Sequence, residues 1–479
     1  MPVHRVGIQI IVGTYDKLLH GTITTVQDSS SLEFFDNFLF EAHTSAVRCI
    51  ALSPPSPSPN VSQQQKIILA SGGSDEKINL YHISLAPPAC EDGISPPPAS
   101  LAGKTTWQNP SNRELGSLLH HSSGINALSF SSKSKLISAA DDNTIAITRT
   151  RDWTVLSSIK APIPKAHGRP SGDTAPLGGT PTGVNDFAVH PSMKFMVSVG
   201  KGEKCIRLWN LITGKKAGIL NFERSLLQGI DEGKWGSGEG RRIKWDAAGE
   251  EFLVVFEKGA VLFGLDSKPK ARIIPSPLTK LQQARYTEIH NLPDLKPELI
   301  LVSTEDGRIL IYSADQSHNE EVCISSSTND IPNLLPIGQI VDKSKSRIKD
   351  FEILEGSNGQ NTTEEVYVVS ASSNGAIRVY SLNIKELLAD AAALRVVNQR
   401  RRMESESNGG GSGGAPTDVK ESALSKPGVK LLGTYETGHR ITCLKAFLMS
   451  APPSAQPEHV STLPNGKRTD NGDKTSEYD

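Results

Sequence analysis

Short apolar strands and tight polar turns alternate along the chain. In residues 69–81 an apolar run leads to Ser71, a polar turn follows at Asp75, and an alternating strand then ends in Tyr81. Apolar side chains at every second position place one face of a strand against a core. Two such strands joined by a short polar turn predict a β-hairpin.

The same hairpin recurs in residues 136–148, 196–209, 301–312 and 369–380. Each first strand carries a serine, most turns carry an acidic residue or asparagine, and most second strands end in an aromatic residue. The serines are Ser71, Ser138, Ser198, Ser303 and Ser370. The turn residues are Asp75, Asp142, Asp306 and Asn374, and the aromatic residues are Tyr81, Trp209, Tyr312 and Tyr380. Such recurrence indicates a repeat architecture.

Further short strands flank these hairpins. They precede the hairpin in residues 46–52, 124–130, 184–189 and 347–353, and they follow it in residues 115–119, 154–159 and 430–435. A degenerate unit at 241–275 keeps the strand rhythm but has lost the polar residues. Four antiparallel strands in each repeating unit are typical of the blade of a β-propeller.

Six units begin near Ala42, His121, Gly183, Arg241, Lys280 and Ser346. A seventh has to be assembled from both ends of the chain. Residues 438–447 form a first strand with nothing but a polar tail behind it, while 8–12, 17–20 and 32–35 form three strands without a first. Joining them removes two exposed sheet edges. The predicted fold is therefore all-β, a seven-bladed propeller in which N-terminal strands pair with a C-terminal strand.

The sequence predicts one propeller domain, 1–449, and a disordered C-terminal tail, 450–479. Pro-, Ser- and Gly-rich insertions are predicted to be largely disordered at 53–65, 85–113, 161–182 and 388–428. Helix-forming residues favour a helix over 385–402, which ends in Arg400, Arg401 and Arg402. These arginines either cap the helix's own C-terminus or form a docking or nuclear-import element.

Composition narrows the class of protein. The chain has 51 Lys and Arg against 52 Asp and Glu, a net charge of -1, which argues against a chain-wide nucleic-acid clamp. The five cysteines are widely spaced and fit neither a disulfide framework nor a zinc site, so we expect a reducing compartment. The N-terminal segment lacks a signal-peptide pattern and an apolar run long enough to span a bilayer, so we expect no membrane association.

No catalytic motif survives inspection. Gly103-Lys104-Thr105 resembles the end of a phosphate-binding loop, but Pro98 stands where the first glycine is required. The acids Asp75, Asp142 and Asp306 lie one to a turn in different units, so they cannot act as a catalytic pair. We therefore expect a protein that is not an enzyme, with no cofactor, no metal and no small-molecule substrate.

The repeated pattern of serine, turn and aromatic residues resembles that of the WD40 family of β-propellers. His43 precedes the first strand, and Ser71, Asp75 and Tyr81 follow at the family's positions. In that family the four side chains form a hydrogen-bond network within one blade. The resemblance extends the network to the serines, turn residues and aromatic residues named above and to His121. Thr148 replaces the aromatic residue in one unit, and Asn374 replaces Asp in another.

A narrower resemblance is to the maintenance-of-killer and PAK-kinase-interacting family of WD-repeat proteins. It is carried by residues 11–21, 40–44, 118–125, 136–142, 190–194, 208–211, 369–375 and 440–444. It implies a nucleolar or nuclear scaffold in ribosome biogenesis, which acts in assembly of the large (60S) subunit and rRNA processing. The implied partners are proteins of the pre-ribosomal particle and rRNA. The same family implies, as the alternative, a signalling scaffold that binds and negatively regulates a PAK-type kinase.

Because the net charge is close to zero, any contact with RNA or with a partner has to be local. The candidates are Arg241, Arg242 and Lys244, and Arg400, Arg401 and Arg402. A substrate-recruiting subunit of a ubiquitin ligase ranks last, since no adaptor-binding helical pair precedes the propeller.

Overall fold

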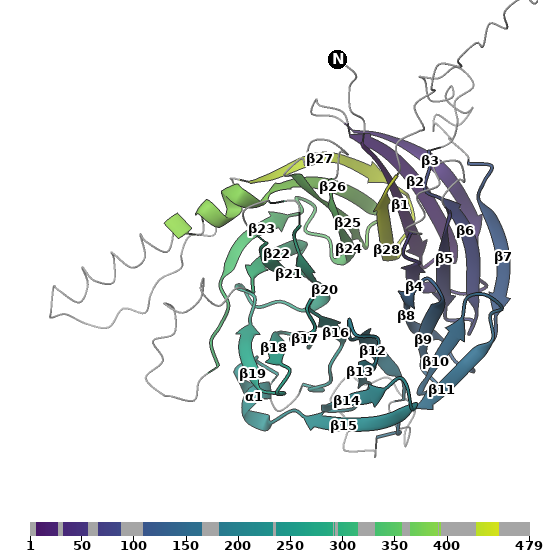
Figure 1. Ribbon diagram of the computed structural model, residues 1–479. Helices are drawn as coiled ribbons and strands as arrows, with labels where there is room; N and C mark the ends of the chain where they lie inside the picture. The colour runs from purple at the N-terminus through teal and green to yellow at the C-terminus, as the bar shows by residue number, and fades with distance from the viewer. Residues whose placement is uncertain are drawn as a thin grey trace, which may run out of the picture.

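The structure is a computed structural model. It describes residues 6–26, 32–55, 66–87, 109–164, 182–232, 236–290, 292, 296–314, 331–356, 365–390, 392–393 and 428–449. Over these residues the chain forms seven four-stranded antiparallel sheets arranged around a central axis (Figure 1). The predicted seven-bladed β-propeller is confirmed.

Six blades are continuous in sequence, and in each the first strand faces the axis (Figure 1). The first three blades are β4 (Val47–Leu52), β5 (Lys66–Gly73), β6 (Ile78–Ser84) and β7 (Arg113–Leu118); β8 (Ile125–Ser132), β9 (Lys135–Ala140), β10 (Thr144–Arg149) and β11 (Val155–Lys160); and β12 (Val184–Val189), β13 (Phe195–Gly200), β14 (Cys205–Asn210) and β15 (Lys215–Asn221). The next three are β16 (Arg242–Trp245), β17 (Glu251–Val255), β18 (Ala260–Gly264) and β19 (Pro269–Ile273); β20 (Leu281–Glu288), β21 (Glu298–Thr304), β22 (Arg308–Ser313) and β23 (Pro336–Val341); and β24 (Ile348–Glu355), β25 (Glu365–Ser372), β26 (Ala376–Asn383) and β27 (Val429–Glu436).

The seventh blade is built from both ends of the chain, as the sequence predicts. Its strands, from the axis outward, are β28 (Ile441–Leu448), β1 (Val6–Thr14), β2 (Leu18–Val26) and β3 (Glu33–Glu41). β28 pairs antiparallel with β1 in a register that places Ile10 opposite Ala446. At Gly13 a Cβ atom would lie only 2.6 Å from Val47 Cγ1, so a glycine lets the closing blade approach β4.

The core lies between neighbouring blades, because each sheet buries the apolar residues of both of its faces. One cluster joins the closing blade to β24–β27 and contains Ile8, Ile10, Val369 and Val379, all fully buried. Strand β25 contributes alternate residues to it, as a period of two requires. The ring is thus a series of sheet-to-sheet contacts.

The degenerate unit forms a complete blade, β16–β19, with an aromatic core. The rings of Phe252 and Phe263 stack with centroids 5.3 Å apart, and Trp245 contacts Phe252 edge-on at 5.0 Å. The short helix α1 (Arg224–Gly229) precedes this blade, and its buried Leu226 and Leu227 join the same cluster. The sequence analysis missed this helix, which is only six residues long.

The ordered structure extends further into the predicted insertions than expected. In 85–113, Leu85 is buried, and buried Asn109 donates from Nδ2 to Ala86 O at 3.0 Å, which fixes the return of the chain to β7. In 53–65, Ser53 is buried and its hydroxyl accepts a bond from Ile68 N at 2.9 Å. Most of the remainder of the insertions, and the tail 450–479, lie outside the described residues.

A helix covers residues 384–390, where the sequence predicts one over 385–402. Its Leu387 is buried against the core of β20–β27. Residues 391 and 394–402, with the arginines at the end, lie outside the described residues. No helix in the described residues is long and apolar enough to cross a membrane.

Candidate interaction surfaces of the propeller

A buried polar network joins the loop before β4 to the strands β5 and β6 and the turn between them. His43 shares hydrogen bonds with Ser71 Oγ at 2.8 Å through Nε2 and with Asp75 Oδ1 at 2.9 Å through Nδ1. Asp75 also accepts a bond from Thr44 N at 2.9 Å, and Tyr81 hydrogen-bonds to Ser71. Burial alone would raise the pKa of Asp75, but these bonds outweigh it and the pKa is lowered.

The blade β8–β11 carries a second network around His121. Its Nε2 lies 2.7 Å from Ser138 Oγ, and its Nδ1 lies 2.8 Å from Thr144 Oγ1 and 3.3 Å from Asp142 Oδ2. Burial lowers the pKa of His121, since the charged imidazolium is poorly solvated there, although Asp142 acts in the opposite direction. Thr144 is thus a further hydrogen-bond partner of His121, which was not predicted from the sequence.

The remaining predicted network residues make smaller sets of contacts. Trp209 Nε1 donates to Ser198 Oγ at 2.8 Å, and Tyr380 hydrogen-bonds to Ser370. Asn374 Oδ1 accepts a bond from Ala376 N at 3.2 Å. In β20–β23 the structure does not bring the residues together: Ser303 Oγ donates to Ile348 O at 3.3 Å in the next blade.

Asp306 pairs with Arg308, whose Nε lies 2.9 Å from Asp306 Oδ2. Among the described residues the Tyr312 hydroxyl has no hydrogen-bond partner.

Two further blades, like β20–β23 with Asp306 and Arg308, use an arginine and an acid in place of histidine and aspartate, which was not predicted from the sequence. Asp342, before β24, is buried and accepts bonds from Arg378 Nη1 at 2.7 Å and Ser372 Oγ at 3.2 Å. In β12–β15, Arg207 Nε donates to Glu203 Oε2 at 3.0 Å. The missed signal was an acid in the loop or turn with an arginine in the third strand. These acid–arginine pairs are formed within their own blades, so we assign them to structure.

The inner strands carry the polar groups that face the axis. At one end of the ring, side chains near the strand starts donate to backbone carbonyls of the neighbouring blade: Thr442 Oγ1 to Val47 O at 2.6 Å, and Asn126 Nδ2 to Val184 O at 2.9 Å. Asn185 Nδ2 donates to Gly240 O, also at 2.9 Å. These bonds show that the starts of the inner strands lie together at one end.

A cationic cluster occupies this end of the ring. It consists of Arg48, Arg242, Arg347, Lys349 and Arg440. Arg48 and Lys349 fall at β-bulges near the starts of β4 and β24, and a bulge redirects a side chain out of the regular alternation. Burial lowers the pKa of Lys349, and Arg347, Arg440 and Arg242 lower it further, so the four side chains are electrostatic neighbours.

Further along the inner strands the charges are paired. Lys244 Nζ lies 2.9 Å from Asp186 Oδ2, and Arg285 Nη2 lies 2.9 Å from Asp350 Oδ1. Glu352 accepts bonds from Arg285 at 3.2 Å and from Lys445 at 2.7 Å. Burial raises the pKa of Glu352 less than Lys445 and Arg285 lower it, so this carboxylate is held ionised.

The predicted contact residues of 241–244 therefore differ in what they offer to a partner. Arg241 pairs with Glu257 at 3.0 Å, and Lys244 is committed to Asp186. The side chain of Arg242 forms no hydrogen bond or ion pair with the described residues, so it is the one of the three that a ligand can engage without breaking a contact. Arg400, Arg401 and Arg402 lie outside the described residues.

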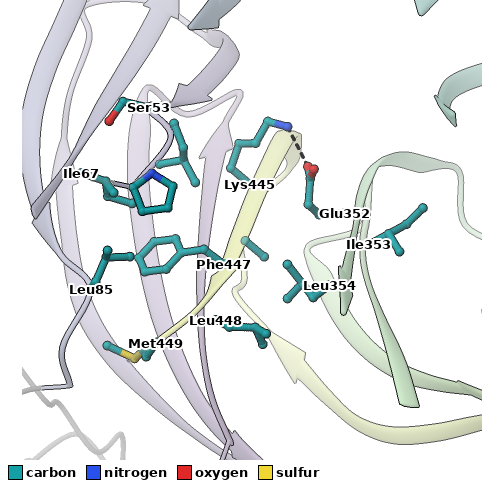
Figure 2. Close-up of a pocket in the computed structure, with 13 residues that line it drawn as sticks. Ser53, Ile67, Leu85, Glu352, Ile353, Leu354, Lys445, Phe447, Leu448 and Met449 are labelled. Carbon is teal, nitrogen blue, oxygen red and sulfur yellow. Dashed lines mark hydrogen bonds and ion pairs between the residues drawn. The ribbon is translucent and has the colours of Figure 1, made fainter. Parts of the chain in front are cut away.

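An apolar groove of about 590 Å³ lies at the opposite end of the inner strands (Figure 2). It is lined by the ends of β4, β24 and β28, with Phe447 at its centre, Ile67 and Leu85 on one side and Leu354 on the other (Figure 2). Lys445 and Glu352 supply its charged wall. The groove and the cationic cluster give the two ends of the ring different binding chemistry.

In the described part of the chain, no group of three or more His, Cys, Asp or Glu residues is placed to hold a metal ion. Most charged groups of the inner strands form ion pairs, with Arg242 and Lys349 as exceptions. The arrangement offers ionic and apolar contacts to a partner.

Comparison with known proteins agrees with this architecture. Residues 36–82 and 112–148 match the family model "WD domain, G-beta repeat". The protein is a WD40-repeat β-propeller of the scaffold type. It is 23% identical over 396 residues to "p21-activated protein kinase-interacting protein 1-like" of Gallus gallus, which covers 83% of this chain and 79% of that protein.

It is also 24% identical over 406 residues to "Protein MAK11" of Saccharomyces cerevisiae, covering 80% of this chain and 79% of the relative. A Danio rerio protein with the kinase-interacting name is 24% identical over 79% of this chain and 75% of its own length. The WD40 repeats and this similarity over most of the chain support the WD40 propeller family of MAK11 and the p21-activated protein kinase-interacting protein 1-like proteins.

Proposed function

We propose that the protein is a non-catalytic scaffold in ribosome biogenesis, which acts in assembly of the large (60S) subunit and in rRNA maturation in the nucleolus. The observation that carries this proposal is the similarity to MAK11 and its relatives over about four fifths of the chain. The sequence motifs that resemble the family occur in nearly every blade. The fold by itself does not choose the partner.

The geometry suits a scaffold. The closed ring holds a cationic cluster at one end of the inner strands and an apolar groove at the other. A partner can therefore be engaged at each end without competition. Since Arg241 and Lys244 already have acidic partners, Arg242 is the residue of that segment which is free to contact a pre-ribosomal partner.

Depletion of the protein followed by sucrose-gradient analysis tests this proposal. We expect a selective loss of free large subunits, with free small subunits unchanged or in excess. Affinity purification after nuclease treatment should recover assembly factors of the large subunit. Normal gradients together with the absence of such factors would contradict the proposal.

The second candidate function is a scaffold that binds and negatively regulates a PAK-type kinase. The specific observation in its favour is the name of several relatives, "p21-activated protein kinase-interacting protein 1-like". It predicts a direct, RNA-independent complex with the regulatory region of the kinase and a fall in kinase activity when the complex forms. Purified components suffice for this test, so its outcome is independent of the gradient profile.

A further inference from the structure

The cationic cluster at the starts of the inner strands contains charges that the protein does not neutralise. Among the described residues, neither Arg242 nor Lys349 has an acidic partner or a hydrogen-bond acceptor. Both are half-buried, whereas Arg440 above them is exposed and rests on the ring of Tyr15 at 5.4 Å. Like charges gathered in partly desolvated positions are unfavourable unless an anion joins them.

The acids near this cluster are already shared. Asp141 pairs with both Arg48 and Lys201, and Glu305 pairs with Arg347. Glu257 is likewise shared between Arg241 and Lys280, at 3.0 and 2.7 Å. These carboxylates cannot move to Arg242 or Lys349 without leaving another cation alone. The cluster therefore has a local positive excess, although the whole chain carries a net charge of -1.

Three inner strands carry these side chains: β24 and β28 contact each other, whereas β20 stands between β16 and β24. Arg242 starts β16, Lys349 lies at the bulge of β24, and Arg440 directly precedes β28. These strands belong to different blades, and each is the strand of its blade that lies next to the axis (Figure 1). Below them the paired charges of Lys244, Asp186 and Arg285 offer no free acceptor or donor of comparable strength. A ligand would meet the free cations first.

We propose that Arg242 and Lys349, with Arg440 at the rim, form an anion site that takes an acidic side chain from an extended segment of a partner protein. A carboxylate or a phosphorylated side chain on its own tether reaches half-buried cations between strand ends. The phosphates of an RNA strand lie on its backbone and need a broad basic track, which a chain with this balance of charge does not supply. The site goes beyond the proposed function, because the segment can belong to a pre-ribosomal protein or to a kinase.

The test measures binding of the full chain to a fluorescein-labelled peptide of alternating Glu and Gly by fluorescence anisotropy. The double variant Arg242→Gln/Lys349→Gln should bind it about tenfold or more weakly, since each charge-assisted contact is lost. The matched control, Lys215→Gln/Lys216→Gln, removes two exposed cations from the outer strand β15 and should bind as the wild type does. Binding by the wild type should also weaken as salt is raised.

Further probes show which chemical group the site binds. A peptide with Gln in place of Glu should not bind, and one with phosphoserine in place of Glu tells whether phosphate is preferred to carboxylate at the same residues. Tighter binding of a single-stranded oligouridine RNA that depends on Arg242 and Lys349 would overturn the assignment to a protein partner. An equal loss of Glu peptide binding in the control variant, or none in the double variant, would overturn the site.

Folding is separated from binding in the same experiment. Because Lys349 has three cationic neighbours, its neutralisation should not lower the temperature of thermal unfolding. The charge-preserving variant Arg242→Lys/Lys349→Arg should retain binding within about threefold. If it loses binding as completely as the Gln variant while remaining folded, charge is not what the site recognises, and the inference fails.

Discussion

The blades β4–β7 and β16–β19 occupy equivalent places in the ring but are held together by different interactions. In the first, the hydrogen-bond network of His43, Ser71, Asp75 and Tyr81 ties the strands and the turn. In the second, no such network links the described residues, and the core is a group of packed aromatic rings, with Phe256 fully buried. Both blades nevertheless keep four strands in the same order.

The difference teaches which of the two interactions the fold requires. Buried apolar area stabilises every blade in proportion to what is removed from water. A polar network contributes only a modest net amount while it is complete, but each of its members is costly when its partner is removed. We therefore expect the two blades to respond differently to the loss of a single side chain.

Opening the ring should destabilise the polar and the apolar blade alike, because both depend on closure of the ring. Deleting the residues after Tyr435 removes β28 and leaves the inner edge of β1 without a paired strand. Unpaired strand edges lead to aggregation, so this truncated chain should be insoluble. Removal of only the residues after Ser450 should be tolerated. A soluble, cooperatively unfolding shorter chain would contradict the closure of the seventh blade.

The apolar blade should be most sensitive to a cavity. Phe256→Ala is expected to lower the free energy of unfolding by about 3 to 5 kcal/mol, since the ring is fully buried and packs on Phe222 with centroids 4.9 Å apart. Urea denaturation measures the loss. Phe256→Leu keeps most of the volume and should cost distinctly less; an equal cost would mean that shape rather than burial is decisive here.

The polar blade should be sensitive to the loss of its histidine. His43→Ala leaves Ser71 and Asp75 without their shared partner and should cost about 2 to 3 kcal/mol. A double-mutant cycle with Ser71→Ala gives the coupling energy, which we expect to be about 1 kcal/mol. Additive costs for the two substitutions would show that the network does not act as a unit.

Acid should weaken the polar blade and leave the apolar one unaffected. The pKa of Asp75 is lowered from its ordinary 3.8 in the folded state. A lowered pKa means that the carboxylate stabilises the fold fully above pH 3.8, and that this contribution is lost as the pH falls below 3.8 and through the lower pKa of the folded state. The difference in unfolding free energy between wild type and Asp75→Asn should therefore shrink from pH 7 to pH 3. A constant difference would contradict the role of the charge.

Two tyrosines at equivalent positions give the smallest and sharpest contrast. The hydroxyl of Tyr81 hydrogen-bonds to Ser71, so Tyr81→Phe should cost about 1 kcal/mol. The hydroxyl of Tyr312 is buried without a partner among the described residues, so Tyr312→Phe should be neutral or slightly stabilising. Thermal unfolding of the two variants measures both effects. Equal losses would show that the ring and not its hydroxyl group is what matters.

Most of the fold can be predicted from the repeat in the sequence, because the strand period and the residues that form turns are local properties. The first strand of the degenerate blade could be found from Ile243 and Trp245 alone, although its polar residues are missing. The helix α1 could not be found, since six residues give too little periodicity and its stability comes from packing of Leu226 and Leu227.

The candidate contact residues were less predictable than the fold. Sequence grouped Arg241, Arg242 and Lys244 as equals, but their partners Glu257 and Asp186 are distant in sequence. Lys349 was not among the predicted contact residues, because no local feature of the sequence distinguishes it. It becomes a candidate because Arg242 and Arg440, on other blades, lie near it. Which cation is free depends on the assembled ring, so it could be learned only from the structure.

The two-ended closing blade also has a consequence for how the protein is made. Thr442 Oγ1 lies 3.0 Å from Gly13 O, across 429 residues of sequence. A ribosome that adds roughly 5 to 20 residues per second needs on the order of 20 to 90 s to make the chain between these two residues. Throughout that time the strands β1–β3 remain on the nascent chain without β28, the inner strand of their blade. The cell has to shield them, so synthesis of this propeller should depend on chaperones until β28 emerges.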